Sequence, residues 1–570
     1  MIKKKISNLK KLINLNNLDG YIIPKNDAYF SEYSFPDRLK IATNFDGSAG
    51  FAIILRKKNY LFVDGRYTIQ AQIQSGKYFK VLEVPKFSPK DILSKKDKKL
   101  TLGFDPQLFT KATLKKKFSN FFDLIPLNEN LVDKIFKKHP KKSIEFFYHL
   151  NDKISGEKIN SKIDRLIKIM KLKNIDNIFV SAPENVAWLL NIRGKDNPHS
   201  PIPNCKIILT VNKKIFFFSC QQKIKLIKRL QNYKKFTFCT YQDFSKIITN
   251  LKGNSFSIDS QTCSVSNENL IKEFFNIKNR LDPCYIMKSI KNKLELKGMI
   301  NAHIEDGLAL TKFIYWIKIK NKKTITEIAA QKKLEKFRKL SRNYLFPSFN
   351  TIAGTGSNGA IVHYRARKKT TKIIKKKDIF LCDSGGQYKY GTTDVTRTIC
   401  FTKQKKSTKD IFTKVLKGHI AVAQTNLMNN NTGKKIDIRA RRFLKKDGLD
   451  YAHGTGHGVG FFLNVHEGPQ SISKFNNIKI KEGMILSNEP GFYKKNYFGI
   501  RIENLVYVKK IKNNIFFENL TLAPIEKDLI NFNLLNKNEK DYLFKYHLNL
   551  YAQYSKFLDL NERKWLASLI

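Results

Sequence analysis

Carboxylates and one histidine interrupt the apolar, strand-like runs in the last third of the chain. Asp383 ends the run DIFLC, Asp394 precedes VTRTIC, Glu489 follows MILSN, and Glu503 lies within FGIRIENLVYV. A carboxylate in a buried strand is costly unless a cation or a hydrogen-bond donor compensates it. Together with His457 in HGTGHGVG, these side chains are a ligand set for a pair of small divalent cations. The fold must therefore bring these strand ends to one place.

The two aspartates are expected at one edge of a sheet, because a hairpin-length segment joins their strands. One carboxylate of such a pair can bridge two cations while the other chelates one of them. Gly385, Gly386 and Gly391 would let the backbone turn tightly near the ions. Taken alone, DSGGQYKYGTTD also fits a turn-rich hairpin with surface aspartates.

Histidines gather in the same window. Glycines flank His453 and His457 in HGTGHGVG and leave both imidazoles uncovered by bulky neighbours. His457 is the natural nitrogen ligand, and His453 could hydrogen-bond a substrate. A lone histidine is usually a satisfied structural residue, but two in one glycine-rich loop point to function.

Two bound cations would lower the pKa of a shared water and hold a hydroxide near neutral pH. That hydroxide would attack a carbonyl, which the cations also polarise. Glu489 could take the proton of the water as general base. The side chains expected to bind or donate to the substrate are His363, His453, His466, Arg501 and Tyr388.

The first half of the chain reads as two copies of one α/β module. A helix at about 2–16 precedes the strands DGYIIP, FAIIL and YLFV, and a helix at about 159–170 precedes DNIFV, CKIILTV and KIFFFSC. In NFDGSAG, Gly47 and Gly50 are expected to adopt positive φ in a turn. Helix-like stretches are expected after YLFVDGRY, to about residue 150. Any two α/β domains look alike at this level, so the duplication is an interpretation.

A third segment opens near Lys288 with long helical periodicity, and Thr324 with Glu327 suggests a capping box for a further helix. Strands are expected at FNTIAGTGSN, IVHYRA, IIKKKDIFLCDSGG and QYKYGTTDVTRTICF. Helices are expected at about 408–428 and 434–447, and again in the tail. The predicted domains are 1–152, 153–287, 288–510 and a C-terminal extension, 511–570.

The net charge of +58 raises the possibility of a nucleic-acid or anionic-surface binder. The basic residues are mostly lysines spread along the whole chain, which favours compositional drift over a dedicated patch, and no specific nucleic-acid partner is expected. The seven cysteines are irregularly spaced without a CxxC pair. This usage is typical of a reducing compartment. No run reaches the ~18 apolar residues of a membrane span, so a cytoplasmic protein without a membrane partner is predicted.

The segment 348–510 resembles the catalytic domain of the pita-bread metallopeptidases, which include methionine aminopeptidase, prolidase and aminopeptidase P. Its ligand order Asp, Asp, His, Glu, Glu is complete. The whole chain is similar to the long, three-domain form of aminopeptidase P (Xaa-Pro aminopeptidase). The matching motifs are NFDGSAG, DGRY, ENVAWLLNIRG, NGAIVHYRA, DSGGQY, TDVTRT, HGTGHGVG, VHEGP, NEPGFY, RIEN and LTLAPI.

The resemblance implies an α/β and α+β multidomain fold: two creatinase-like N-terminal domains, a pita-bread catalytic domain and a helical C-terminal extension. It implies a homodimer that removes the first residue from peptides with proline in second position. Two divalent ions, commonly Mn²⁺ with Zn²⁺ or Co²⁺ possible, would be bridged by Asp394 and Glu503, with Glu489 as base. The implied metal ligands are Asp383, Asp394, His457, Glu489 and Glu503, and the implied substrate histidines are His363, His453 and His466.

Two alternatives remain open at this point. Prolidase shares the ligands but favours dipeptides, and the long two-module N-terminal region argues against it. A basic pita-bread binding module for nucleic acid or protein would suit the charge, but such a module lacks the ligand set that this chain keeps.

Overall fold

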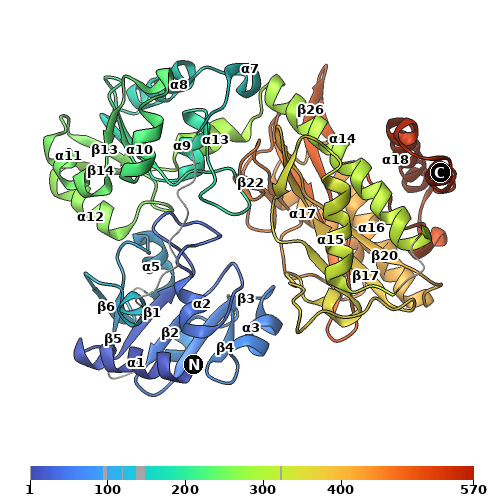
Figure 1. Ribbon diagram of the computed structural model, residues 1–570, viewed down its shortest axis with the longest axis horizontal. Coiled ribbons are helices and arrows are strands. Elements are labelled where there is room, and N and C mark those ends of the chain that lie inside the picture. Colours follow the sequence, from blue (N-terminus) through green and yellow to red (C-terminus); the bar gives the residue numbers. More distant parts are fainter. Residues whose placement is uncertain (1, 94–98, 119, 137–147, 321–323) are drawn as a thin grey trace. The chain divides into compact units, whose positions relative to one another are not determined.

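The computed structural model describes residues 2–93, 99–118, 120–136, 148–320 and 324–570. The chain forms two compact units (Figure 1). Unit 1 comprises Met1–Asn151, Glu157–Pro198 and Ile202–Tyr285, and unit 2 comprises Asp152–Gly156, His199–Pro201 and Ile286–Ile570. All the predicted metal and substrate residues belong to unit 2.

Unit 1 contains two six-stranded sheets of the same topology. The first is formed by β1 (Gly20–Pro24), β2 (Phe51–Leu55), β3 (Asn59–Asp64), β4 (Lys80–Val84), β5 (Leu100–Phe104) and β6 (Phe122–Pro126). The second is formed by β8 (Asn177–Val180), β10 (Lys206–Thr210), β11 (Ile215–Phe218), β12 (Thr237–Cys239), β13 (Ser255–Ile258) and β14 (Asn276–Asn279). Their orders are β4-β3-β2-β1-β5-β6 and β12-β11-β10-β8-β13-β14, with antiparallel central pairs and parallel outer pairs in both. This identity is what two copies of one module predict.

Helices cover both faces of the first sheet. Since successive strand residues point to opposite faces, one strand can pack against helices on both sides. Ile23 on β1 packs in one apolar cluster with Leu9 of α1 (Ile2–Leu15), whereas Ile22 packs with Phe118 of α5 (Lys111–Phe118) in the other. The remaining helices of unit 1 are α2 (Arg38–Thr43), α3 (Thr68–Ser75), α4 (Pro89–Leu93), α6 (Leu131–Ile135), α8 (Ile159–Leu172), α9 (Pro183–Leu189), α10 (Gln221–Ile227), α11 (Phe244–Asn250) and α12 (Val265–Phe274). The short pair β7 (Tyr148–His149) and β9 (Ile192–Arg193) completes the unit.

Two expectations for unit 1 were wrong. The stretch expected to be helical contains the strands β4, β5 and β6, which at five residues each are too short to be told from helix turns by periodicity. Residues 137–147 lie outside the described part. Gly50 has φ +143°, but Gly47 is not among the positive-φ glycines. Gly47 is needed for space, because a Cβ there would lie 2.2 Å from the ring of Phe45.

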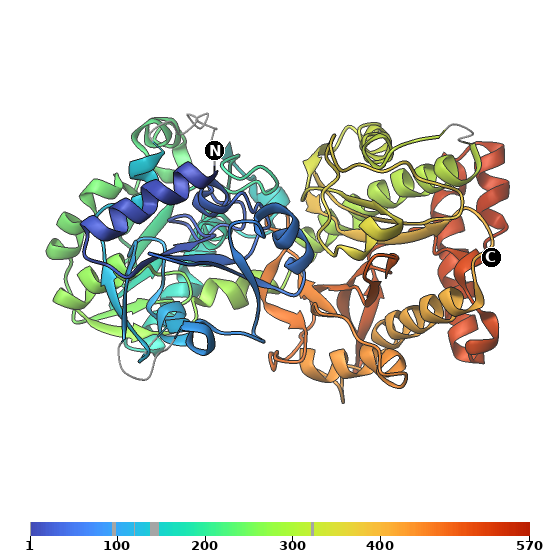
Figure 2. The same cartoon turned by 90° about the horizontal axis from the view of Figure 1, so that it is seen from below.

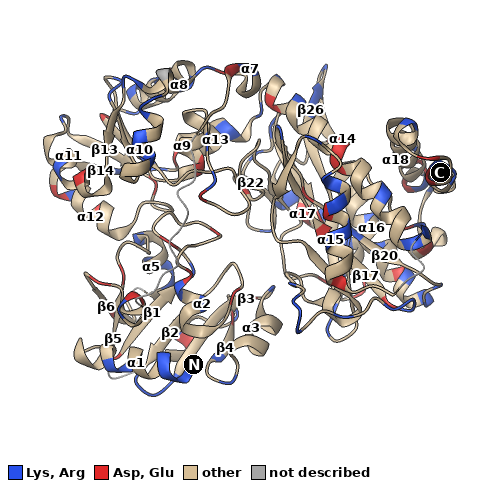
Figure 3. Cartoon of the chain, in the orientation of Figure 1, with Lys and Arg blue, Asp and Glu red and all other residues tan. Residues whose placement is uncertain are grey.

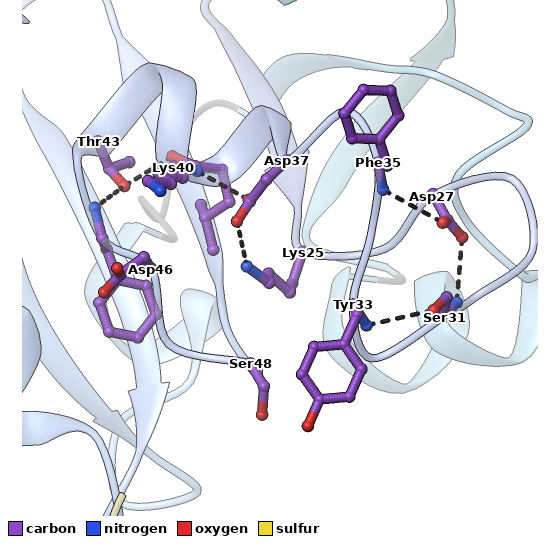
Figure 4. Close-up of polar contacts among 12 residues, drawn as sticks. Lys25, Asp27, Ser31, Tyr33, Phe35, Asp37, Lys40, Thr43, Asp46 and Ser48 are labelled. Atoms are coloured by element: carbon purple, nitrogen blue, oxygen red, sulfur yellow. Dashed lines mark hydrogen bonds and ion pairs between the residues drawn. The ribbon is translucent and has the colours of Figure 1, made fainter. Parts of the chain in front are cut away.

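The loop between β1 and β2 is held by two aspartates (Figure 4). Asp27 accepts hydrogen bonds from the backbone N–H groups of Tyr29 at 2.9 Å and Ser31 at 3.0 Å. Asp37 caps α2 by accepting from the Lys40 N–H at 3.0 Å and pairs with the buried ammonium of Lys25. Side-chain acceptors therefore satisfy the backbone of this irregular segment.

Unit 2 carries its strands in four small sheets. Three strands, β16 (Ile352–Thr355), β17 (Ile379–Ser384) and β20 (Val395–Cys400), form one antiparallel sheet. A five-stranded sheet has the order β22 (Glu467–Ile472), β21 (Gly456–Gly458), β23 (Ile485–Asn488), β26 (Asn504–Ile511), β27 (Asn514–Asn519). The other two sheets are β15 (Tyr344–Pro347), β18 (Gly386–Tyr388), β19 (Gly391–Thr392), and the hairpin β24 (Gly491–Lys494), β25 (Phe498–Arg501).

Helices of unit 2 pack against these sheets (Figures 1 and 2). α14 and α15 share an apolar cluster with β17 and β20, and α16 packs with α18 through Leu416 and Tyr546. The tail is helical as predicted. The helices are α7 (Asp152–Ser155), α13 (Pro283–Ser289), which spans the unit boundary, α14 (Lys293–Tyr315), α15 (Glu327–Arg338), α16 (Lys406–Ala423), α17 (Gly433–Lys445), α18 (Lys537–Tyr554) and α19 (Leu560–Ala567).

Two expectations for unit 2 were also wrong. IVHYRA is not a strand; it is an irregular segment after the 3₁₀ turn η4 (Gly356–Ala360). The N-cap of α15 is Thr326, which accepts from the Ala329 N–H, and not Thr324. Glu327 does not close a capping box, because its carboxylate accepts hydrogen bonds from the Thr355 N–H and from the hydroxyl of Tyr364 instead.

Basic residues are distributed over both units and do not gather on one element (Figure 3). Within the described residues, no helix is long and apolar enough to cross a bilayer. The distribution agrees with a general lysine coat.

His547 on α18 provides a pH-dependent contribution to stability. Burial, followed by the nearby Arg397 charge, lowers its pKa to about 4, and its Nε2 accepts from the Ile525 N–H at 3.3 Å. Because the pKa of the folded state lies below the ordinary value of about 6.5, the unfolded state binds more protons between these values. The stabilisation is complete above pH 6.5 and is lost as the pH falls toward 4.

We predict that His547→Gln will reduce this pH dependence by about 2 kcal/mol between pH 8 and pH 5. Thermal unfolding of both proteins at the two pH values measures it, and the variant should lose less stability on acidification. Equal losses in variant and parent would contradict the assignment.

Candidate metal centre and active site

The four predicted carboxylate ligands lie at strand ends in unit 2. Asp383 is on β17 and Asp394 directly precedes β20, while Glu489 directly follows β23 and Glu503 directly precedes β26. Since β17 pairs antiparallel with β20, and β23 with β26, each pair delivers two carboxylates at one end. Glu503 was expected inside a strand, but it occupies the break between β25 and β26.

His457 on β21 joins three of these carboxylates. Its Nε2 lies 3.5 Å from Asp394 Oδ2 and 3.6 Å from Glu489 Oε1, and ligand atoms of Asp394, His457 and Glu503 all lie within 4.8 Å of one another. Its Nδ1 lies 3.0 Å from the Gly458 carbonyl oxygen. Because a carbonyl only accepts, Nδ1 carries the proton in the neutral ring, and the Nε2 lone pair faces the carboxylates.

Glycines around His457 make this approach possible. A Cβ on Gly456 would lie 1.9 Å from the Ser487 carbonyl oxygen, and one on Gly458 would lie 2.4 Å from the Glu467 carbonyl oxygen. The glycines of HGTGHGVG therefore let β21 fit closely between β22 and β23. The sequence analysis expected these glycines to leave the imidazoles uncovered, whereas the structure shows that they allow close strand packing.

Arg501, predicted to bind substrate, is 2% exposed and serves the carboxylates. Its Nη2 donates to Asp383 Oδ2 at 2.5 Å and its Nε donates to Thr396 Oγ1 at 3.1 Å. The Thr396 hydroxyl in turn donates to Glu503 Oε2 at 2.7 Å. One arginine and one threonine thus orient carboxylates from two different sheets.

Two of the predicted substrate histidines connect to this cluster. The His466 ring lies 4.4 Å from that of His457, centroid to centroid. His453 Nε2 lies 2.8 Å from the hydroxyl of Tyr493, which accepts from Arg501 Nη1 at 2.5 Å. A chain of hydrogen bonds therefore links His453 through Tyr493 and Arg501 to Asp383.

His363 is half-buried on the irregular segment after η4. The 3₁₀ turn η4, which directly precedes this segment, packs closely on β25, since a Cβ on Gly499 would lie 1.9 Å from the Gly359 carbonyl oxygen. The neighbouring hydroxyl of Tyr364 donates to Glu327 at 2.8 Å and holds the segment from the other side.

Tyr388 is not brought to the cluster. It is fully buried, and its hydroxyl donates to Asp306 on α14 at 2.7 Å, beside the guanidinium of Arg338. Its predicted contact with substrate stays a prediction that none of these contacts supports.

Sequence reasoning missed Tyr493. It lies within the motif NEPGFY and faces Gly499 across the β24–β25 hairpin. The signal available in the sequence was a tyrosine within this motif. Only the fold shows that its hydroxyl meets His453 and Arg501.

The buried cluster carries more negative charge than its environment can solvate. Burial, together with the neighbouring carboxylates, raises the pKa of Asp394 to about 6 and that of Glu503 well above its ordinary value. Burial opposes protonation of His457, but Asp394 and Glu489 outweigh it and raise its pKa to about 9. Protons therefore neutralise part of the negative charge of this group, and bound cations could neutralise it instead.

The donor atoms fit divalent cations. Among the described residues, Oδ1 of Asp383 and Oδ1 of Asp394 are buried without a hydrogen-bond partner. Carboxylate oxygens with one imidazole suit Mn²⁺, Zn²⁺ or Co²⁺. A second group of potential ligands, Cys400, Glu526 and Asp528, differs because the ammonium of Lys318 already bridges its two carboxylates, at 2.5 and 3.0 Å.

We predict that Mn²⁺ will raise the thermal stability of the chain, by about 2.7 kcal/mol at a concentration one hundred times its dissociation constant. Binding should release protons, because the cluster holds them in the absence of cations. Calorimetric titration and thermal melts measure both effects.

Asp394→Asn should remove the shift, and Asp528→Asn, in the group that Lys318 occupies, should leave it intact. Equal Mn²⁺ affinity in the Asp394→Asn variant and in the parent would refute this placement of the cations.

Comparison with known proteins assigns the whole chain. Residues 297–510 match metallopeptidase family M24, 5–134 and 138–295 match creatinase/prolidase N-terminal domains, and 514–569 match the C-terminal region of peptidase M24. A probable Xaa-Pro aminopeptidase P of Laccaria bicolor is 37% identical, covering 99% of this chain and 92% of the relative. Xaa-Pro aminopeptidase 1 of Dictyostelium discoideum is 36% identical, covering 96% and 92%.

A solved structure extends the likeness to the full fold. The crystal structure of an X-prolyl aminopeptidase from Caenorhabditis elegans, described as a cytosolic enzyme with a di-nuclear active site, superposes with a TM-score of 0.93 at 29% identity. The match covers 100% of this chain and 99% of that one. The chain belongs to metallopeptidase family M24, in the form that carries two creatinase/prolidase N-terminal domains and a C-terminal M24 region.

Proposed function

We propose that this chain is a dinuclear-metal aminopeptidase that releases the N-terminal residue from peptides with proline in the second position. The observation that carries the proposal is the buried group Asp383, Asp394, His457, Glu489 and Glu503, complete in a chain whose relatives over nearly its full length are named Xaa-Pro aminopeptidases. A binding module that had lost its metals would not retain this group.

The five side chains Asp383, Asp394, His457, Glu489 and Glu503 would hold two cations. When bound, these cations supply Lewis acidity: they lower the pKa of a water and polarise the scissile carbonyl. We favour Mn²⁺ because four of the five donors are carboxylates, with Zn²⁺ or Co²⁺ as alternatives.

Glu489 is the proposed general base. The Ser487 hydroxyl donates to its Oε1 at 3.2 Å, and its backbone N–H donates to the Thr455 carbonyl at 2.8 Å, so the carboxylate is oriented from both ends. In this position it can accept the proton of the attacking water and pass it toward the leaving amine.

The three histidines would handle the peptide. His453 is oriented by the hydroxyl of Tyr493, which links it through Arg501 to Asp383, and the ring of His466 lies against that of the predicted ligand His457. Together with His363, they would donate hydrogen bonds to the scissile amide and its developing oxyanion. Arg501 would act through Asp383 and Tyr493 rather than on the substrate, given its own contacts.

Domain limits and setting complete the proposal. The domains would be 1–152, 153–287, 288–510 and 511–570. The family matches support four segments in this order and the limit near 510, whereas the two N-terminal matches meet at residues 134–138. A cytoplasmic location follows the description of the Caenorhabditis elegans relative as cytosolic. A homodimer rests on the family resemblance alone.

We predict that the Mn²⁺-loaded protein will release the first residue from Xaa-Pro-Xaa tripeptides and that Asp394→Asn will abolish this release, because a neutral amide cannot replace the bridging carboxylate. Rates on a tripeptide and on an Xaa-Pro dipeptide, measured side by side, test it. Activity confined to the dipeptide would identify a prolidase instead.

Tyr493→Phe should lower kcat about tenfold, equivalent to about 1.4 kcal/mol of barrier, because His453 loses its orienting hydroxyl. Tyr497→Phe is the matched control, since Tyr497 is in the same hairpin but 64% exposed. Steady-state kinetics that gave both variants the parent rate would exclude this role for Tyr493.

A further inference from the structure

Arg441 on α17 contacts the loop of residues 450–455, which carries His453. The guanidinium is 5% exposed and makes four hydrogen bonds. Its Nε donates to Asp437 Oδ2 at 2.8 Å, its Nη1 donates to Asp450 Oδ1 at 2.6 Å and to the Tyr451 carbonyl at 2.8 Å, and its Nη2 donates to the His453 carbonyl at 2.5 Å. The guanidinium carbon also lies 3.9 Å from the ring centroid of Tyr451. A lysine ammonium cannot reproduce this planar fork.

Asp437 connects the same network to Glu489. Its Oδ1 accepts from the Thr455 hydroxyl at 2.6 Å, and the Tyr451 hydroxyl lies 2.5 Å from Thr455 Oγ1. The Thr455 carbonyl accepts the Glu489 N–H at 2.8 Å. The ion pair therefore contacts His453 directly, through its carbonyl oxygen, and is linked to Glu489 through Thr455.

Packing of α17 does not require this ion pair. The helix already has an apolar face, formed by Ile436, Ala440 and Leu444, which are buried in the clusters around β22, β23 and α16. Burying a charged pair costs desolvation that apolar residues of similar size would avoid. The pair, spaced i,i+4 on a regular helix, is rigid, and its outer donors are all directed at the loop of residues 450–455.

We propose that Asp437 and Arg441 are positioning residues that fix His453 and Glu489 relative to one another for the reaction proposed above, on which this inference rests. Neither side chain touches the five ligands in the contacts of the described residues. Their effect is to hold the loop of residues 450–455 in place, so that the His453 imidazole and the Glu489 carboxylate keep a fixed orientation toward the same peptide bond.

The test compares Arg441→Ala and Arg441→Lys with the control Arg442→Ala, whose side chain is exposed on the same helix. For both Arg441 variants, kcat should fall about 10- to 100-fold, KM should change less than threefold, and the Mn²⁺-induced melting shift should persist. Methylguanidinium should restore part of the kcat of Arg441→Ala and should not affect Arg442→Ala.

Hydrogen exchange gives a readout that does not depend on peptide hydrolysis. The Glu489 amide, which bonds to Thr455, and the amides of residues 450–455 should exchange at least tenfold faster in Arg441→Ala, while those of α16 should not change. If the parent protein proves inactive but this exchange rises, the proposed function fails, while the restraint of residues 450–455 and Glu489 by Arg441 stands.

The positioning role is overturned if Arg441→Ala keeps the parent kcat and exchange pattern. It is also overturned if kcat loss merely follows a global loss of stability, without rescue by methylguanidinium. Should Arg441→Ala not fold, Arg441→Lys decides: a parent-like kcat in that variant refutes the role, because its ammonium cannot make the four bonds.

Discussion

The structure of unit 2 depends on one costly arrangement, the burial of several carboxylates within a few ångströms of each other. Asp394 and Glu503 are almost fully buried, and burial with mutual repulsion raises both of their pKa values. Two like charges in a low-dielectric site cannot both ionise without compensation. Cations resolve this conflict, and the surrounding donors from Arg501 and Thr396 fix which oxygens remain available to them.

The loops that carry His363, His453 and His466, the proposed substrate histidines, share one feature. Each is held by a buried charged group that is not one of the five predicted ligands. Glu327 holds the segment after η4 through Tyr364, and Arg441 holds the loop of His453. Glu467, the neighbour of His466, is paired with Lys288 at 3.1 Å and with Lys291. Such anchors give irregular loops the rigidity that a catalytic arrangement requires.

Much of this could be predicted from sequence, because the ligands are few, chemically distinct and placed at strand ends. The strand runs around Asp383 and Glu489 and the helices at about 408–428 and 434–447 follow the hydrophobic pattern closely. The failures have physical causes. IVHYRA has strand-like composition but is fixed as an irregular segment by Glu327, a partner far away in sequence. Tyr388 looked like a site residue by its motif, yet its hydroxyl is used by Asp306. The roles of Tyr493 and Arg441 arise only when hairpin and helix meet the loop of His453.

The central claim is that the carboxylate and imidazole group in unit 2 exists to hold two cations. Crystals grown with Mn²⁺ and measured at the manganese absorption edge test this most directly. The account predicts two anomalous peaks per chain among Asp383, Asp394, His457, Glu489 and Glu503, with Asp394 and Glu503 in contact with both. A single peak, or peaks at other side chains with none at these five, would contradict the account.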